Sequence, residues 1–310
     1  MPIQGELVKL VDAGVKGFKC FMIESGVEVE PSGWSQGACF VLNDNPYRNS
    51  HAFLKVIYVL PWMRSRYEGV CSILQGVSAN KTQDTGSVLL FHAEVDNHSV
   101  PQSLDDPTRY STFLNSRPEA FEVDAISRIA DLQREYSTLR CHIVHLSAAS
   151  ALPTIRGAKA AGHKLTVETC FHYLCLASDT IPNGRPEFKC CPPIRDDANR
   201  EALWTALLDG TIDFVVSDHS PCVAELKKLD EGDIMGAWGG ISTLGLGLSL
   251  LWTEGRKRKV PIGTILQWTS QKTASHAGLA DRKGKIAAGY DADLIIWDPD
   301  AEYIVRFSSF

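Results

Sequence analysis

The sequence predicts an α/β protein built around a largely parallel sheet, as an incomplete (β/α)8 barrel. From residue 87 onward, short apolar runs alternate with stretches of helical period, which is typical of βαβ units. The runs are continuously apolar rather than alternating, as in strands that are covered on both faces. Several runs also end directly at an ionisable residue, and the carboxyl ends of barrel strands are where such folds place an active site.

The elements follow one another with recognisable boundaries. Apolar spacing predicts a short helix over 3–11, and GVKGFKCF (14–21) is predicted as a strand. Further strands are expected at 87–91, 141–146, 164–170 and 213–217. Helices are expected at 122–136, 150–161, 197–209, 241–254 and 262–277. Gly162 and Gly210 are the predicted stops of the second and third of these helices.

Two segments do not fit the alternation. Residues 28–85 have no clean period, and we interpret them as an atypical insertion, with disorder as one reading. GKIAAGYDADLIIWDP (284–299) has β character with glycine-rich turns. We therefore predict a partial barrel over 1–280 and a partial β-sandwich over 281–310. Only about five barrel strands can be counted where eight are needed, so the first three are expected to precede Met1.

Composition excludes several classes of protein. The chain of 310 residues has a net charge of −6 and no broad basic face, which argues against nucleic-acid binding. No apolar run approaches the roughly 20 residues of a membrane span. Nine cysteines without a C-x-x-C are too sparse for a disulfide scaffold and favour a reducing compartment. With no signal-peptide pattern at the start, a cytoplasmic protein is expected.

Four residues at the ends of predicted strands are candidate metal ligands: Lys19, His92, His145 and Asp218. Taken singly, each has an ordinary interpretation, as a surface lysine, a core histidine or a helix cap. Together, imidazole and carboxylate donors suit Zn²⁺ with an open position for a reactive water. Asp218 is then the expected general acid–base, able to move a proton from that water to a leaving nitrogen.

Neighbouring residues leave alternatives open. In CHIVHLS, alternation places His142 and His145 on opposite faces, and we favour His145 because it ends the run. His172 is either structural or a second layer of the site. The tandem prolines of KCCPPIRDD (189–197) predict a stiff loop with exposed carbonyls. A thiol nucleophile at Cys190 or Cys191 is a further alternative, although no partner histidine is placed for it.

These motifs resemble those of the cyclic amidohydrolases, most closely the allantoinase family. The resemblance is carried by LLFHAE, HIVHLS, VETCFHYL, the KCCPPIRDD loop, VVSDHSPC and AWGGIS, and is nearly continuous from residue 87 to 299. It implies a (β/α)8 barrel with a small β-sandwich and two zinc ions bridged by a carboxylated Lys19. It also implies hydrolysis of the hydantoin ring of allantoin to allantoate in purine catabolism, in a homotetramer. Carried over by position, Cys191 and Ser220 fall at substrate-binding positions.

The family's opening His-x-His motif is missing, since none of the nine histidines lies two positions from another. We therefore expect a truncated form with low stability and little activity on its own. Two other interpretations compete with an allantoinase-type enzyme. One is a hydantoinase- or dihydropyrimidinase-like cyclic amidase, and the other is a non-catalytic scaffold. The four surviving ligands argue against the scaffold.

Overall fold

Six strands form one sheet in the order β2-β1-β3-β4-β5-β6. They are β1 (Val15–Phe21), β2 (Cys39–Asn43), β3 (Val88–His92), β4 (Arg140–Ile143), β5 (Leu165–Cys170) and β6 (Phe214–Val216). β1, β3, β4, β5 and β6 run parallel, which confirms all five predicted strands. This computed structural model describes residues 15–23, 39–43, 87–96 and 106–304, so the helix predicted at 3–11 lies outside the described residues.

The strand β2 was not predicted. It pairs antiparallel with β1 at the edge of the sheet and falls inside the stretch that the sequence analysis interprets as an insertion. The run CFVL supplies aromatic and β-branched residues that favour a strand, although it is too short to show a period. On its other side, β1 lies so close to β3 that a Cβ at Gly17 would be 2.7 Å from the carbonyl oxygen of Val88. Glycine at this position therefore permits the pairing.

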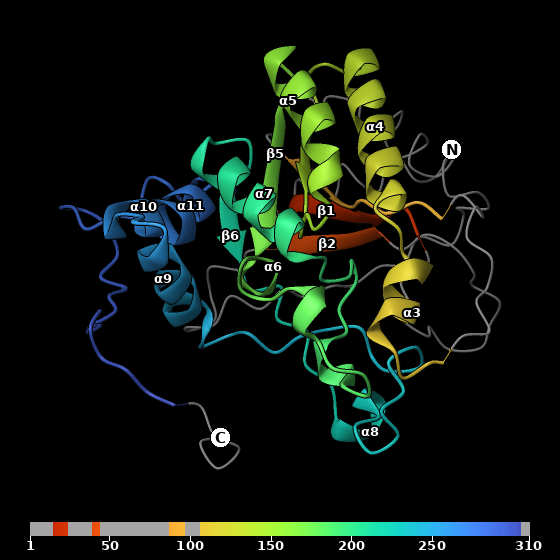
Figure 1. Ribbon diagram of the computed structural model, residues 1–310. Coiled ribbons are helices and arrows are strands. Elements are labelled where there is room, and N and C mark those ends of the chain that lie inside the picture. The colour runs from red at the N-terminus through yellow and green to blue at the C-terminus, as the bar shows by residue number, and fades with distance from the viewer. Residues whose placement is uncertain (1–14, 24–38, 44–86, 97–105, 305–310) are drawn as a thin grey trace. The chain divides into compact units, whose positions relative to one another are not determined.

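The helices of the first unit, residues 1–247, accompany this sheet. They are α3 (Tyr110–Ser116), α4 (Ala120–Glu135), α5 (Leu152–Ala160), α6 (Phe171–Cys175), α7 (Asp197–Leu208) and α8 (Ala224–Lys227). Short 3-10 turns lie at Ala149–Ala151, Ser178–Thr180 and Pro186–Phe188. Figure 1 shows α4 beside α5, and the two are in contact. Gly162 and Gly210 follow α5 and α7 with positive φ angles, as predicted.

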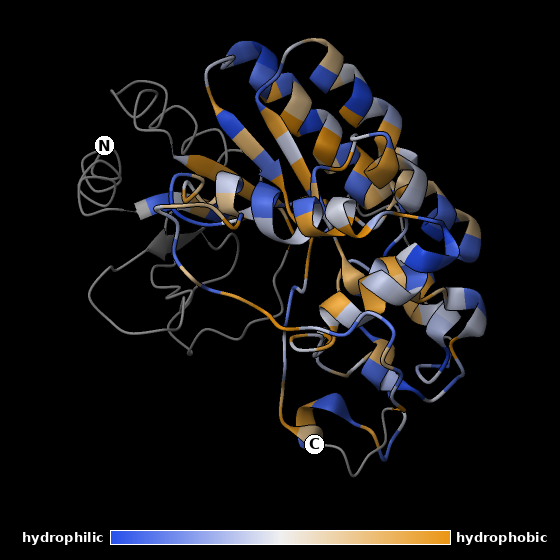
Figure 2. Ribbon diagram, turned by 90° about the vertical axis from the view of Figure 1, so that its left-hand side faces the viewer, coloured by the Kyte–Doolittle hydropathy of each residue, from blue (hydrophilic) through white to orange (hydrophobic). Residues whose placement is uncertain are grey.

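Amphipathic helices and apolar strands build the core of this unit. In Figure 2, hydrophobic and hydrophilic residues alternate around the helices. Ile129 of α4, Ile155 of α5 and Trp204 of α7 are almost fully buried, together with Phe91 and Ile143 from the sheet. α7 is further fixed at its start, where the Asp196 side chain accepts a hydrogen bond from the backbone of Asn199.

The second unit, residues 248–310, is helical in its described part. It contains most of α9 (Gly247–Lys257), then α10 (Ile262–Leu266), a π-helical turn (Gln267–Gln271) and α11 (Lys272–His276). The predicted partial β-sandwich at 281–310 is not confirmed, because residues 281–304 contain no strand. Ile295 and Ile296 are 79% and 103% exposed, since the described part of this unit offers them no strand to pair with. No described helix is both long and apolar enough to cross a bilayer.

Candidate functional site

The sheet brings two predicted ligands together at the carboxyl ends of its strands. The register pairs Phe21 of β1 with His92 of β3, and the two rings stack with centroids 4.9 Å apart. His145 lies two residues beyond the end of β4, and its Nε2 is 3.0 Å from Nδ1 of His92. Both histidines are buried. The structure thus brings His145 and not His142 to His92, whereas the ring of His142 stacks on Phe214 and contacts Thr166.

His145 and Asp218 share an uncommon backbone conformation. Their φ angles are 44° and 43°, in the left-handed region that non-glycine residues seldom adopt. His145 lies two residues beyond the end of β4, and Asp218 lies two residues beyond the end of β6. Such conformations cost about 1–3 kcal/mol each and cluster at functional sites. The strain therefore supports a role for both residues beyond packing.

The charges of the four candidates influence one another. Burial lowers the pKa of the His145 imidazole well below its usual value, and neighbouring His92 lowers it further. Burial alone would raise the pKa of Asp218, but His145 and the Lys19 ammonium outweigh it and lower the pKa overall. Asp218 is therefore held as a carboxylate that can accept a proton. Lys19, on β1, also has its Nζ 5.1 Å from the centroid of the Phe21 ring.

The sequence analysis did not assign Glu94 or Arg117, and it left His172 open. Glu94 is fully buried, accepts a hydrogen bond from Nε2 of His92 at 2.7 Å and is paired with Arg117 at 2.6 Å. Burial raises the pKa of Glu94, but Arg117 and His92 bring it down to about 2. The motif His-Ala-Glu at a strand end was the available signal, because residues two apart there lie on the same side. Nothing in the sequence points to Arg117.

His172 is the second residue of α6, and its imidazole is 2% exposed. Neither ring nitrogen has a hydrogen-bond partner. Burial lowers the pKa of His172 to about 4, opposed only by the charge of Asp218. A buried imidazole without partners is costly and requires an explanation. Because the charge of Asp218 acts on the pKa of His172, we group His172 with the candidate site rather than with the general core.

The donors partly fit a metal ion. Two imidazole nitrogens that share one tetrahedral zinc lie about 3.3 Å apart, close to the separation of the His92 and His145 nitrogens. Nδ1 of His145 and both nitrogens of His172 are buried without partners. Among the residues that the structure describes, however, no three His, Cys, Asp or Glu side chains already form a metal-binding group. The spacing of the histidine pair suits a shared ion, and the roles of Asp218 and Lys19 as ligands stay predictions.

The loop around Cys190–Pro193 is closed by hydrogen bonds within the first unit, and Pro192 and Pro193 are buried, so the prediction of exposed carbonyls there is wrong. The hydroxyl of Tyr173 donates to the carbonyl of Pro192 at 2.6 Å, and that of Ser147 donates to the carbonyl of Pro193 at 2.5 Å. The Lys227 ammonium donates to the carbonyls of Lys189, Trp238 and Gly240 at 3.0, 2.9 and 2.7 Å. Lys227 thereby ties this loop to the 238–240 segment.

The two predicted substrate-binding residues both lie against that segment. The Sγ atom of Cys191 lies 2.9 Å from where a Cβ on Gly239 would be, and Ser220 packs equally closely on Gly240. Burial raises the pKa of both the Cys190 and the Cys191 thiols. Because a thiolate is the reactive form, this disfavours the thiol-nucleophile alternative at neutral pH.

Replacing Gly240 with alanine is expected to destabilise the fold by about 1–3 kcal/mol, since the new Cβ overpacks the site. It would lie 2.4 Å from the Ser220 carbonyl oxygen and 2.6 Å from its side chain, so backbone must move. Urea unfolding measures the change. Gly157→Ala is the matched control, because a Cβ in this α5 position meets nothing within 4 Å. That control is expected to stabilise by about 0.5–1 kcal/mol. Equal effects of the two variants would contradict the predicted crowding.

The parallel sheet, the ionisable residues at its strand ends and the buried histidine pair together make up the candidate site of an α/β fold. The model of the amidohydrolase family matches residues 90–309, and the chain belongs to this family. The fold neighbours agree. D-hydantoinase from Thermus sp. superposes with a TM-score of 0.69 at 25% identity, covering 93% of this chain and 56% of the hydantoinase. The predicted α/β class is confirmed, while the truncation of the barrel stays a prediction.

Within the family, the similar curated proteins are allantoinases. The chain is 41% identical to the allantoinase of Saccharomyces cerevisiae, covering 98% of this chain and 58% of that protein. It is 45% identical to the mitochondrial allantoinase of Aquarana catesbeiana, covering 89% of this chain and 49% of that protein. The chain thus spans about half the length of the curated relatives it matches.

Proposed function

We propose that the protein to which this chain belongs hydrolyses the cyclic amide of allantoin to allantoate, with Zn²⁺ as the metal. The observation that carries the proposal is the buried pair His92–His145, facing each other at 3.0 Å in a chain 41% identical to an allantoinase. Members of the amidohydrolase family generally bind metal, which suits this pair. When bound, the metal supplies Lewis acidity towards the amide and acidifies a water for attack.

The remaining steps fall to side chains of this chain. His92 and His145 would hold the metal, since Nδ1 of His92 and Nε2 of His145 face each other. Asp218, with its lowered pKa, takes a proton from the attacking water and delivers it to the leaving ring nitrogen. Lys19 is the proposed carboxylated bridge to a second ion. Cys191 and Ser220 line the side on which the ring binds, and the assembly proposed for the whole protein is a homotetramer.

Sequence identity favours allantoin as the substrate over simple hydantoins and dihydropyrimidines. Identity to allantoinases reaches 41–45%, whereas it is about 22–25% to the hydantoinases of known structure. A hydantoinase-like activity therefore remains the second candidate.

The test is hydrolysis by the purified full chain, supplied with Zn²⁺, Mn²⁺ or Co²⁺ and offered a panel of cyclic amides. Allantoin is expected to be cleaved with a kcat/KM well above that for hydantoin or dihydrouracil. The reason is that a site that hydrogen-bonds the ureido group of allantoin discriminates against cyclic amides that lack this group. The readout is formation of the ring-opened ureido acid. Faster cleavage of hydantoin would favour the second candidate. Cleavage of no amide by this chain is the result expected of a truncated form, whereas cleavage of no amide by the longer protein would contradict the proposal.

A further inference from the structure

The imidazole of His92 is hydrogen-bonded to the buried carboxylate of Glu94. Its Nε2 lies 2.7 Å from Oε2 of Glu94, which is completely buried. An ionised carboxylate can only accept, so the imidazole must carry its proton on Nε2. In its neutral form, His92 then offers a lone pair at Nδ1, the atom that faces His145. The contact with Glu94 thereby decides which nitrogen is free to bind.

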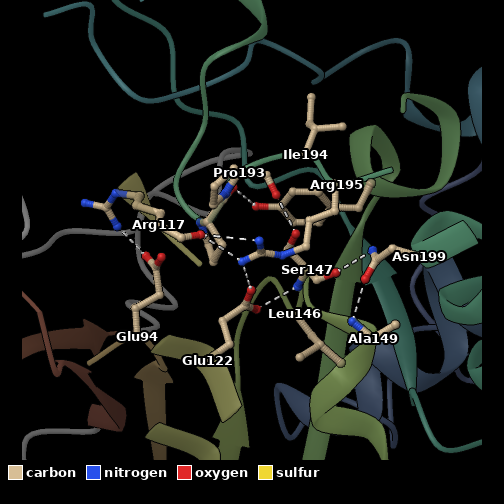
Figure 3. Close-up of polar contacts among 12 residues, drawn as sticks. Glu94, Arg117, Glu122, Leu146, Ser147, Ala149, Pro193, Ile194, Arg195 and Asn199 are labelled. Carbon is tan, nitrogen blue, oxygen red and sulfur yellow. Dashed lines mark hydrogen bonds and ion pairs between the residues drawn. The ribbon is translucent and has the colours of Figure 1, made fainter. Parts of the chain in front are cut away.

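Glu94 is itself paired with Arg117, which belongs to a larger network of hydrogen bonds and ion pairs (Figure 3). Nη1 of Arg117 lies 2.6 Å from Oε2 of Glu94, and the Arg117 carbonyl accepts hydrogen bonds from both terminal nitrogens of Arg195 at 3.3 Å. Arg195 pairs with buried Glu122 at 3.0 Å. Glu122 in turn accepts from the backbone N–H of Ser147 at 2.9 Å.

This network of contacts ends close in the chain to the second histidine, because Ser147 follows His145 by two residues. Two buried carboxylates are matched by two guanidinium groups, so its net charge is balanced. Arg195 also follows Pro193 by two residues, and Ser147 donates to the Pro193 carbonyl. One set of contacts therefore runs from His92 to Ser147, two residues from His145, and to the loop that carries Cys191.

We propose that Glu94 and Arg117 are positioning residues that fix the ring orientation and protonated nitrogen of His92, so that its Nδ1 faces Nε2 of His145. Partners of this kind orient metal-binding imidazoles and raise their basicity. The metal part of this inference rests on the proposed function, whereas the tautomer part does not. A purely structural ion pair would leave the His92 tautomer unaffected when it is removed.

The first measurement is the ¹⁵N NMR spectrum of histidine-labelled, chelator-treated full chain. In the wild type, His92 is expected to be protonated at Nε2 only. In Glu94→Gln, a mixture of tautomers is expected, because a carboxamide can donate or accept and no longer dictates the proton's place. The double variant Glu94→Gln/Arg117→Met removes both charges together, so neither is left buried alone. It is expected to show the same mixture and serves if a single variant fails to fold.

The second measurement is titration of each protein with Zn²⁺ or Co²⁺ alone, by calorimetry. Both variants are expected to bind about 10–100-fold more weakly than the wild type. Lys159→Met is the matched control, since Lys159 forms a 2.7 Å pair with Asp213 and its side chain is 23% exposed, against 21% for Arg117. This control is expected to change neither the tautomer nor the affinity.

The outcomes separate the two proposals. A wild type with fixed His92 tautomer that binds no metal supports the positioning role and contradicts the proposed function. A wild type that binds metal, with tautomer and affinity unchanged in both variants, overturns the positioning role and leaves the proposed function standing. Equal loss of affinity in Lys159→Met also overturns the inference, because the effect would then follow from any lost ion pair.

Discussion

Replacing Asp218 with asparagine is expected to lower kcat for ring hydrolysis by about 10²–10⁴-fold, the usual contribution of a positioned general acid–base. Asparagine keeps the shape and hydrogen-bonding ability of the side chain but cannot carry the proton. Because the pKa of Asp218 is held below its ordinary value by His145 and Lys19, the carboxylate is the form present at neutral pH. Steady-state kinetics on the metal-loaded chain measure the loss, while circular dichroism checks the fold.

The matched control is Asp213→Asn, at the opposite end of the same strand. Asp213 precedes β6 and accepts hydrogen bonds from the Val167 backbone and from Lys159, both at 2.7 Å. Barrel folds reserve the carboxyl ends of strands for chemistry, and the amino ends contribute to stability. Asp213→Asn is therefore expected to lower stability and to leave kcat unchanged. A similar fall of kcat in both variants would show that Asp218 acts through the fold alone.

Acidification is expected to destabilise the metal-free chain steeply between pH 6.5 and pH 4. Burial lowers the pKa of His172 from 6.5 to about 4 in the folded state. Between these values the unfolded chain binds the proton and the folded chain does not, so stability falls as pH falls. His172 alone accounts for about 3 kcal/mol, and buried His145 adds to it in the same direction. Urea unfolding across this range measures the effect.

His172→Phe is expected to flatten this pH dependence, since phenylalanine retains the buried ring and cannot titrate. His163→Phe is the control, because the partly exposed His163 lies on the loop before β5. A further loss of stability is expected below pH 4.5, as Glu94, with its pKa of about 2, becomes protonated. An unchanged slope in His172→Phe would show that His172 is not the group responsible.

Much of the fold was predictable because most strands and helices of this chain are recognisable from short stretches of sequence. The five parallel strands coincide with short, mostly apolar runs of the sequence, and α5 and α7 are followed by Gly162 and Gly210 as expected. The strand β2 was missed because five residues are too few to show a period, and its pairing with β1 is a long-range choice. The LIIW run was overestimated as a strand, because a strand also needs a neighbour that the run itself cannot supply.

The candidate site was likewise predictable only in part. The sequence by itself determined that His92, His145 and Asp218 follow strands, since a polar residue ending an apolar run is visible locally. Only the tertiary structure decided that the nitrogens of His92 and His145 face each other, and that Glu94 is held by Arg117 from 23 residues away. Such contacts depend on strand register and on charges buried together. They arise when distant segments pack, and no period or spacing in the chain encodes them.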